Sequence, residues 1–390
     1  MKKNSPKLKI ALVGLGASGS VIARLFQKDK QIKEIACFVR NVQKAKEFLP
    51  DGTRKIRLKR IDLEKTRFAR EISGADLVIN AASSKINLEI MDAALKAGIN
   101  YLDLASHHLR NPFKAEQLEF DAKFKKQGLK GLVCAGVAPG ISNLLIRELA
   151  EEFDTVNDIK LRLAEHIVSQ DVISSWSPEM AVEELSQDVP VYENGRFLLR
   201  PPFSGEEIYD YPPPFGKMPA TLICQDEQLT VPLFIKTKNM DVKSGGGDIE
   251  PMKLLYKLGM FSRKPIGTGK NRITARTLLE KIMPPTPSPK EMASIIKKSR
   301  IREARFGIVC EISGRKNGRP KKAKDWIIFP SIFQINKIMP GATYISYPTG
   351  LAAYLFAKNL AAADFTGVIP PEGLEPKIGD RILRALKHGF

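Results

Sequence analysis

The stretch KIALVGLGASG, from Lys9 to Gly19, decides the fold of this 390-residue chain. Its glycines at 14, 16 and 19 form the pattern G-x-G-x-x-G, directly after an apolar, strand-like run and before the helix-like SGSVIARLFQK. In that context the pattern predicts a dinucleotide site. Gly14 permits the tight turn, Gly16 lets the backbone approach a pyrophosphate, and Gly19 lets helix and strand pack closely. The alternative is a structural glycine turn without a ligand.

The helix predicted after these glycines offers an anion site at its first residues, Ala17 and Ser18. Free backbone N–H groups and the helix dipole both favour a negative charge at that end. We therefore expect the pyrophosphate of a dinucleotide to be bound by Gly14, Gly16, Ala17, Ser18 and Gly19.

Six strand-like runs alternate with helix-like stretches across the first 140 residues. They cover residues 9–14, 34–39, 55–62, 76–82, 99–105 and 131–137. Within residues 84–98, apolar residues recur on one helical face, and Gly98 is placed to end that helix. Short strands joined by helices form βαβ units, and these build a parallel sheet covered on both faces. The predicted fold class is therefore α/β, with the doubly wound parallel sheet of the Rossmann type.

The end of the second predicted strand, CFVRN (37–41), indicates which dinucleotide binds. Val39 lies 20 residues after Gly19, where NAD-binding folds carry an acid that holds the ribose. A carboxylate there would repel a 2′-phosphate, whereas Arg40 and Asn41 offer hydrogen-bond donors to one. We therefore expect NADP(H) as the cofactor. The alternative is that Arg40 is merely exposed at the start of a helix.

Two further strand ends should face the same crevice, because ligands of open α/β sheets bind outside the carboxyl ends of the strands. Asp62 ends the third run and is expected beside the adenine. Asn80, Ala81 and Ala82 end the fourth run, where small residues leave room for ribose and nicotinamide. We expect these four residues to complete the cofactor site.

The composition bounds the rest of the chain. A length of 390 residues, 43% of them hydrophobic, predicts two domains with a sizeable core. The start reaches the glycine turn before any long apolar run, and no 18-residue apolar stretch exists, so we expect no signal peptide, no membrane span and a cytoplasmic location. Four widely spaced cysteines indicate reduced, buried thiols. Four histidines without ligand spacing, and no C-x-x-C, predict no metal site.

The formal charge of +19 is compatible with nucleic acid, an anionic cofactor or an acidic substrate. The densest basic stretch, GRKNGRPKKAK (314–324), contains Asn317 and Gly318 between two strand-like runs, which is typical of a hairpin turn. No aromatic residues interleave with these charges, as a single-strand binder would need. We therefore favour a solvated hairpin tip and expect no nucleic-acid partner.

The sequence resembles the saccharopine dehydrogenase family, in particular its reductase-like branch. The resemblance covers most of the chain and rests on GLGASG, DLVINAASSKINLEIMDAALKAGINYLDLA, GVAPGISN, WSPEMAVEEL and IPPEGL. It implies a dinucleotide domain at 1–140 and a second, α+β domain with a mixed or antiparallel sheet at 141–343, which binds substrate and mediates dimerisation. The C-terminal helices at 344–390 would return to the first domain. The implied reaction moves hydride to or from a C–N centre, imine or amine, of an amino-acid or polyamine-derived substrate.

Two positions qualify the resemblance. Ala138 stands where reductases of this family often carry an acid before Pro-Gly. The basic residue that they carry in a strand of the second domain corresponds loosely to Lys243, in MDVKSGGGD. The resemblance thus implies that Lys243 grips a substrate carboxylate, while Ala138 leaves the identity of the substrate open.

Hydride transfer to an imine requires from the protein a proton donor and cations for the carboxylates of the substrate. Asp103 and His107 follow the fifth strand-like run, so both are candidates for proton handling, with capping of the loop as the alternative. Ser142 and Asn143 open a predicted helix and are a candidate carboxylate seat, with ordinary helix capping as the alternative.

Two classes of function follow. The first is an NADP-dependent oxidoreductase, a homodimer by the resemblance, that acts on a small-molecule amino-acid or imine substrate. The second is a non-catalytic nucleotide-binding or nucleic-acid-associated protein that keeps the fold. Salt-dependent binding to a random duplex without NADPH turnover would favour the second.

Overall fold

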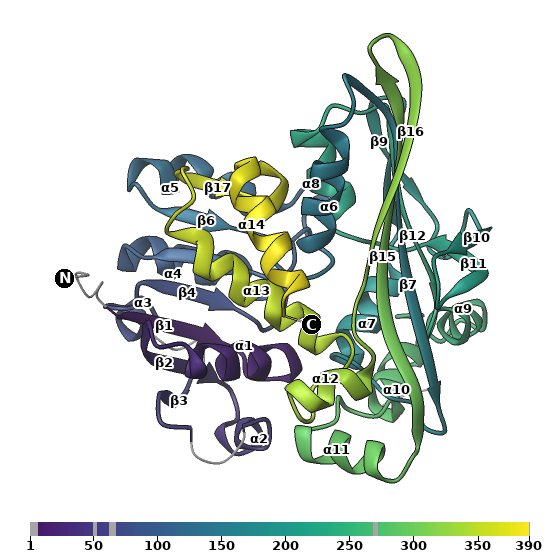
Figure 1. Ribbon diagram of the computed structural model, residues 1–390. Coiled ribbons are helices and arrows are strands. Elements are labelled where there is room, and N and C mark those ends of the chain that lie inside the picture. The colour runs from purple at the N-terminus through teal and green to yellow at the C-terminus, as the bar shows by residue number, and fades with distance from the viewer. Residues whose placement is uncertain (1–6, 50–52, 62–67, 268–271, 390) are drawn as a thin grey trace. The chain divides into compact units, whose positions relative to one another are not determined.

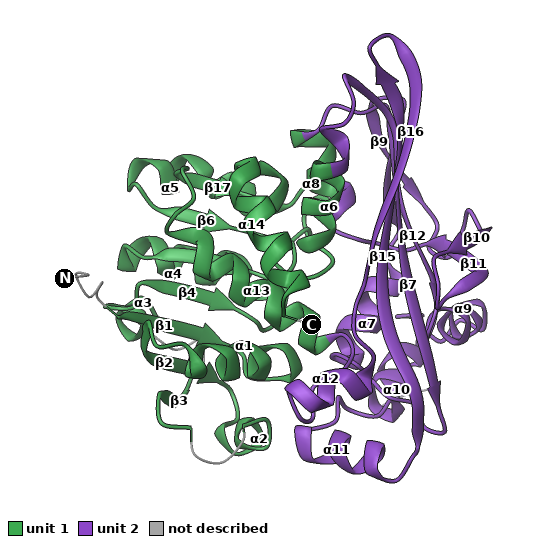
Figure 2. Cartoon of the chain, in the orientation of Figure 1, with its two compact units in different colours: residues 1–148, 229–234, 346–390 green, residues 149–228, 235–345 purple. Residues whose placement is uncertain are grey.

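The computed structural model describes residues 7–49, 53–61, 68–267 and 272–389, and the chain divides into two compact units (Figures 1 and 2). Unit 1 comprises Met1–Glu148, Leu229–Phe234 and Ser346–Phe390. Unit 2 comprises Leu149–Gln228 and Ile235–Ile345. Residues from both ends of the chain therefore share one unit.

Unit 1 contains a seven-stranded sheet in which every described pair of neighbouring strands is parallel. Its order is β17-β6-β5-β4-β1-β2-β3. The strands are β1 (Leu8–Val13), β2 (Ile32–Val39), β3 (Ile56–Arg60), β4 (Leu77–Asn80), β5 (Asn100–Asp103), β6 (Lys130–Leu132) and β17 (Gly367–Ile369). The reversal of strand order beside β1 is the doubly wound arrangement, so the predicted Rossmann fold class is confirmed.

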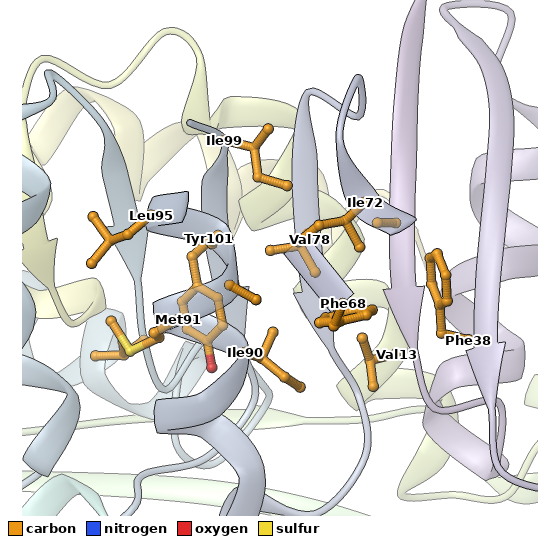
Figure 3. Close-up of a cluster of buried hydrophobic side chains, with 14 of the residues drawn as sticks. Val13, Phe38, Phe68, Ile72, Val78, Ile90, Met91, Leu95, Ile99 and Tyr101 are labelled. Carbon is orange, nitrogen blue, oxygen red and sulfur yellow. The ribbon is translucent and has the colours of Figure 1, made fainter. Parts of the chain in front are cut away.

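Helices cover both faces of this sheet (Figure 1). They are α1 (Ala17–Lys28), α2 (Val42–Lys46), α3 (Phe68–Ile72), α4 (Asn87–Ala97), α5 (Asp121–Lys126), α6 (Ile141–Ala150), α13 (Ser346–Leu360) and α14 (Pro376–Lys387), with short 3-10 turns at Ser84–Ile86, Glu116–Phe120 and Pro371–Gly373. Gly98 ends α4 in the left-handed conformation, at φ 67°, as its position predicts. On one face, side chains of α3, α4 and α5 join those of β1, β2, β4 and β5 in a buried apolar cluster (Figure 3).

The helix α13 returns from the C-terminal part of the chain and packs against α1. Eleven of its residues are buried, including Ala352 and Phe356. A Cβ on Gly350 would lie 2.6 Å from Cβ of Val21, so the two helices approach as closely as a glycine allows. The alanine-rich composition of α13 therefore serves a close helix–helix contact within unit 1.

Unit 2 is built on an eight-stranded mixed sheet with the order β10-β11-β12-β7-β15-β16, and β8 pairs with both β12 and β9. Its strands are β7 (Thr155–Ser169), β8 (Val189–Glu193), β9 (Arg196–Arg200), β10 (Glu207–Tyr211), β11 (Gly216–Leu222), β12 (Asn239–Gly246), β15 (Ile301–Lys316) and β16 (Arg319–Ile328). The pair β12–β7 is parallel and the others are antiparallel, which confirms the expected mixed sheet. Asn317 and Gly318, at φ 50° and 74°, form the predicted hairpin tip.

The remaining elements are helical apart from a small hairpin. They are α7 (Pro178–Ser186), α8 (Glu227–Phe234), α9 (Ile249–Lys257), β13 (Pro265–Ile266), β14 (Ile273–Thr274), α10 (Ala275–Ile282), α11 (Pro289–Lys297) and α12 (Ile332–Ile338). The sequence LTVPLF, at 229–234, reads as part of a strand but lies in α8. Leu229 and Val231 of this segment are buried, whereas Leu233 and Phe234 are exposed, so tertiary context rather than β propensity decides its structure.

Two expectations about the chain as a whole can be compared with the structure. All four cysteines are buried and free, as their wide spacing predicts. Within the described ranges, none of the helices combines the length and apolar character needed to cross a bilayer.

Candidate active site

The three glycines of the first turn meet different surroundings. A Cβ on Gly14, whose φ is +87°, would lie 2.8 Å from the backbone nitrogen of Ala82. A Cβ on Gly19 would lie 2.3 Å from the carbonyl oxygen of Gly14. A Cβ on Gly16, in contrast, meets no atom within 4 Å. Two glycines therefore let the chain pack on itself, and the third leaves open space over the backbone, as a pyrophosphate requires.

Helix α1 begins at this open space. Its N-cap is Gly16, no side chain of the described residues caps it, and its first turn carries no acid. The backbone N–H groups of Ala17 and Ser18 are thus left for an external acceptor, and no carboxylate opposes an anion there. The geometry of the turn fits the phosphate groups of a dinucleotide.

The end of β2 lies beside the end of β3. Val39 pairs with Arg60 in the parallel register, and Arg40 follows directly, so two arginines stand at adjacent strand ends. Both are exposed, and within the described ranges neither forms an ion pair. Asn41 caps α2, because its Oδ1 accepts a hydrogen bond from Lys44 N at 3.0 Å. Arg40 and Arg60 therefore offer two exposed cations at the strand ends where a 2′-phosphate is expected. Asp62 lies outside the described residues.

Asn80, at the end of β4, is buried and engaged with the protein. Its Nδ2 donates to Oδ1 of Asn87 at 2.5 Å and its Oδ1 accepts from Ala82 N at 3.0 Å. Asn87 in turn donates to the carbonyl of Ala105 at 2.8 Å. Asn80 therefore shapes the loop that carries Ala81 and Ala82, and Ala82 itself is exposed at the sheet edge.

Asp103 ends β5 with its carboxylate fully buried. It accepts hydrogen bonds from Tyr101 Oη at 2.9 Å, from Gln117 Nε2 at 2.9 Å and from the backbone nitrogen of Cys134 at 2.7 Å. A carboxylate held by three donors inside the protein ties β5, the following loop and β6 together. This geometry favours the structural alternative for Asp103.

His107 lies in the loop after β5 and is backed by a carboxylate. Its Nδ1 is 3.2 Å from Oε2 of Glu116, without hydrogen-bond geometry, and its backbone nitrogen donates to Gln117 Oε1 at 2.7 Å. Burial of the Glu116 carboxyl is outweighed by hydrogen bonds from Arg110 and Asn111, so the pKa of Glu116 is lowered. An anionic Glu116 therefore lies beside the imidazole ring, and a histidine next to a carboxylate is a pairing found in sites of general acid–base catalysis.

Ser142 and Asn143, at the start of α6, are both fully buried. Oδ1 of Asn143 accepts from Gly140 N at 2.8 Å and from Ser142 Oγ at 3.3 Å. Its Nδ2 donates to Oε2 of Glu372 at 2.9 Å and to Thr230 Oγ1 at 3.3 Å. All the bonding capacity of the Asn143 amide is therefore used inside unit 1, which favours a positioning role over a carboxylate seat.

Lys243 lies on β12 of unit 2, next to a buried arginine. Its Nζ is 3.2 Å from Oε1 of Glu207 and 4.0 Å from Oδ2 of Asp241. The same two carboxylates bind Arg162, at 2.7 and 2.6 Å. The two cations and two anions balance one another, so the positive charge of Lys243 is already compensated within the sheet.

Unit 2 also gathers four acids that are distant in the sequence, here called the acidic cluster: Glu165, Glu184, Asp226 and Glu227. Burial raises the pKa of Glu165 to about 7, although Tyr344 Oη donates to its carboxylate at 2.8 Å. Burial together with the charges of Asp226, Glu227 and Glu165 raises the pKa of Glu184 to about 8. Within the described ranges neither Glu165 nor Glu184 forms an ion pair with a lysine or arginine. Within the described ranges, these four acids therefore lie close enough for their charges to interact, in a chain whose net charge is +19.

The described residues contain no group of histidine, cysteine and acidic side chains arranged to hold a metal ion. For a dinucleotide the fit is good, because the open space at Gly16, the uncapped start of α1 and the exposed arginines meet its pyrophosphate and 2′-phosphate.

This geometry agrees with comparison to known families. The sequence pattern of the family described as the saccharopine dehydrogenase NADP binding domain matches residues 10–131. Residues 10–131 are a saccharopine dehydrogenase NADP-binding domain. The expected family and the expected cofactor NADP(H) are therefore confirmed.

Relatives of the whole chain have related names. The chain is 26% identical over 385 residues to the carboxyaminopropylagmatine dehydrogenase of Synechocystis sp., covering 94% of this chain and 93% of the relative. It is 23% identical over 408 residues to the carboxynorspermidine synthase of Vibrio cholerae, covering 95% and 93%. The similarity therefore extends beyond the NADP-binding domain and through unit 2.

Solved structures support the fold. The apo saccharopine dehydrogenase (L-Glu forming) from Saccharomyces cerevisiae matches with a TM-score of 0.68 at 12% identity, over 98% of each chain. The homospermidine synthase of Legionella pneumophila, in complex with NAD, matches with a TM-score of 0.69 at 13% identity, over 97% of this chain and 89% of that one. The two-unit fold of the family is thus present along the whole chain.

Several residues at the site escape prediction from sequence. Arg60 is found through strand register, and Glu116 through its contact with His107. Glu372 lies within the motif IPPEGL but meets Asn143 from 229 residues away. For Arg60 the signal was available, since it stands near the end of the third strand-like run. For Glu116 and Glu372 no local pattern reveals the partner.

Proposed function

We propose that this protein is an NADP-dependent oxidoreductase of the saccharopine dehydrogenase type that forms or oxidises the secondary amine of a polyamine- or guanidine-derived substrate. The observation that carries the proposal is the similarity over 94–95% of the chain to a carboxyaminopropylagmatine dehydrogenase and a carboxynorspermidine synthase. The names of both relatives describe a carboxylated amine built on a polycationic chain. Both alignments extend over the NADP-binding domain and unit 2 of this protein.

The acidic cluster supports the cationic character of the substrate. Buried carboxyl groups with raised pKa values gain strongly from a cation, because an ammonium or guanidinium group restores the charge that burial penalises. A carboxylate-rich substrate would instead raise the cost of ionising Glu165 and Glu184 further, and would gain no charge pairing from them. The cluster therefore favours the amine-bearing chain of a polyamine as the part of the substrate bound by unit 2.

NADPH, when bound, supplies a hydride to the imine carbon, and a proton added to nitrogen or already present there completes the secondary amine. The turn at Gly16 and the start of α1 would hold the pyrophosphate, and Arg40 with Arg60 would hold the 2′-phosphate. His107 is the group we assign to the proton, because it lies in the loop after β5 with its Nδ1 3.2 Å from the carboxylate of Glu116. Asp103 and Asn143 act by holding the surrounding loops.

The test is an absorbance assay of NADPH oxidation with agmatine or simple diamines, each paired with a carboxylated aldehyde or a 2-keto acid. The reverse direction is followed with NADP⁺ and the purified products. Turnover with amine pairs, and loss of turnover in His107→Asn, is the expected result, with NADPH binding retained in that variant. NADPH binding without turnover on any pair would instead leave a non-catalytic nucleotide-binding protein.

The homodimer implied by the family resemblance remains part of the proposal. Light scattering coupled to size exclusion is expected to give twice the mass of one chain at micromolar concentration. A single-chain mass over that range would contradict it.

A further inference from the structure

A buried carboxyl group stands at the edge of the unit 1 sheet where the nucleotide is expected. Glu372 lies in the 3-10 turn Pro371–Gly373, three residues after the end of β17, and is 4% exposed. The parallel strands β17 and β6 both end at this edge, and Gly136 to Asn143 follow β6. Burying a carboxyl group costs free energy unless it is paired. We therefore expect Glu372 to have a role that offsets this cost.

The contacts of Glu372 are one-sided. Its Oε2 accepts a hydrogen bond from Nδ2 of Asn143 at 2.9 Å, while Oε1 is buried without a hydrogen-bond partner among the described residues. Two further side chains of neighbouring helices lower the pKa of the Glu372 carboxyl group. They are the uncharged hydroxyl of Thr230, on α8, and the charged Arg147, on α6. Burial nevertheless raises the pKa of Glu372 to about 7, so both its forms exist near neutral pH.

The orientation of the Asn143 amide links Glu372 to the turn after β6. Oδ1 of Asn143 accepts from the backbone nitrogen of Gly140, so the amide cannot rotate without setting its NH₂ group against that N–H. A protonated Glu372 consequently meets Asn143 through a neutral hydrogen bond only. Ionised Glu372 accepts a charge-assisted bond, which is roughly twice as strong.

We propose that Glu372 is a positioning residue that acts through Asn143, fixing the turn at residues 136–140 when its carboxyl is ionised and loosening it when protonated. The inference rests on the proposed function for its effect on catalysis. The effect on the turn is independent of any reaction. Ionisation of Glu372 would then set the acid side of the pH–rate profile.

The first test measures the turn directly. Hydrogen exchange of the peptide covering residues 133–145 is followed by mass spectrometry from pH 6 to 8, corrected for intrinsic exchange, in the NADPH complex. Protection in the wild-type protein is expected to rise by about tenfold over this range, the gain of a charge-assisted over a neutral bond. In Glu372→Gln it should stay constant. Equal pH dependence in the two proteins overturns the proposal, whatever the enzyme does.

The second test measures the consequence. The kcat of the wild-type enzyme is expected to fall below about pH 7, and that fall should be absent in Glu372→Gln, with kcat at pH 8 reduced about tenfold. Glu375→Gln is the matched control, since Glu375 is exposed three residues along the same segment. Glu372→Asp keeps an ionisable group, so its kcat should still fall below about pH 7. This variant tests the proposal if Glu372→Gln does not fold. If exchange responds but no substrate turns over, the proposed function fails while the positioning role stands.

Discussion

At the scale of single residues, the candidate site separates into groups that hold the fold and groups that are left for ligands. The polar side-chain atoms of Asp103 and Asn80 form hydrogen bonds with neighbouring loops. Arg40 and Arg60 are exposed at the ends of adjacent strands and carry no described ion pair. Selectivity for NADP should therefore depend on the arginines and be insensitive to the buried acids and amides.

Replacing either arginine tests this division. Arg40→Ala and Arg60→Ala are each expected to weaken NADPH binding by about tenfold, the loss of one charged hydrogen bond to phosphate, and to leave NADH binding unchanged. Titration of both nucleotides by fluorescence measures the ratio. Arg57→Ala is the control, because Arg57 is an exposed arginine of the same strand that lies three residues before the strand end. An unchanged NADPH-to-NADH ratio in Arg60→Ala would assign the phosphate to Arg40 alone.

The unfolding free energy of the protein should depend on pH through the titration of Glu372. Its folded pKa of about 7 lies above the ordinary value of 4.5, so its carboxyl contributes most favourably below pH 4.5, and this contribution is lost as pH rises toward 7. Glu372→Gln does not titrate. The unfolding free energy of the wild-type protein should therefore fall relative to that of the variant as the pH rises from 5 to 8. The total change in this difference should be up to about 3 kcal/mol. Urea denaturation at several pH values measures this, and a constant difference would contradict it.

At the scale of elements, local sequence predicts what is built locally. The strands β1 to β6, the glycine turn and the end of α4 at Gly98 follow from patterns within about 20 residues. The strand β17 was missed, because three residues, Gly-Val-Ile, carry no period of their own and pair with β6 only in the folded chain. LTVPLF has the composition of a strand but lies in α8, so local propensity alone does not predict its structure. The acidic cluster was missed for the same reason, since its members come from β7, α7 and the start of α8.

Gly14 and Gly16 of the glycine turn should respond differently to substitution. Gly14→Ala is expected to destabilise unit 1 by about 1–3 kcal/mol, because φ is +87° and the new Cβ meets Ala82. Gly16→Ala should destabilise the protein less than Gly14→Ala, because its Cβ meets no atom within 4 Å, yet reduce NADPH affinity about tenfold. Thermal unfolding without nucleotide and NADPH titration separate the two effects. Equal destabilisation by both substitutions would show that Gly16 is structural.

At the scale of the whole molecule, charge is distributed unevenly. The net charge is +19, and part of the excess lies in the β15–β16 hairpin, where Lys316 and Lys321 pair with Asp154 and Glu152. Against this background the acidic cluster of unit 2 is the exception. The average charge of the chain therefore favours anions in general, whereas the acidic cluster is the part of unit 2 to which the proposed function assigns a cationic substrate.

The acidic cluster predicts how the amine substrate binds. Glu184→Gln is expected to raise KM for a diamine about tenfold while leaving the Kd for NADPH unchanged, because one carboxylate contact to an ammonium is lost. Binding of the amine should also release protons at pH 7, since a cation lowers the raised pKa values of Glu165 and Glu184. Calorimetry in two buffers of different ionisation enthalpy measures the release. Asp188→Asn, an exposed neighbour, is the control, and an equal rise of KM in both variants would refute the assignment.

The composition of unit 1 from separate parts of the chain bears on how the protein is made. Strands β1 to β6 leave the ribosome first, but β17, which completes their sheet, is translated only after all of unit 2. Until then the nascent sheet exposes the backbone of β6 as an unpaired edge, a template for pairing with other chains. α13 and α14, which pack on the same unit, also arrive last. A polypeptide whose translation stops before Gly367 keeps that edge open permanently, so premature termination late in the message should yield aggregates rather than a working nucleotide domain.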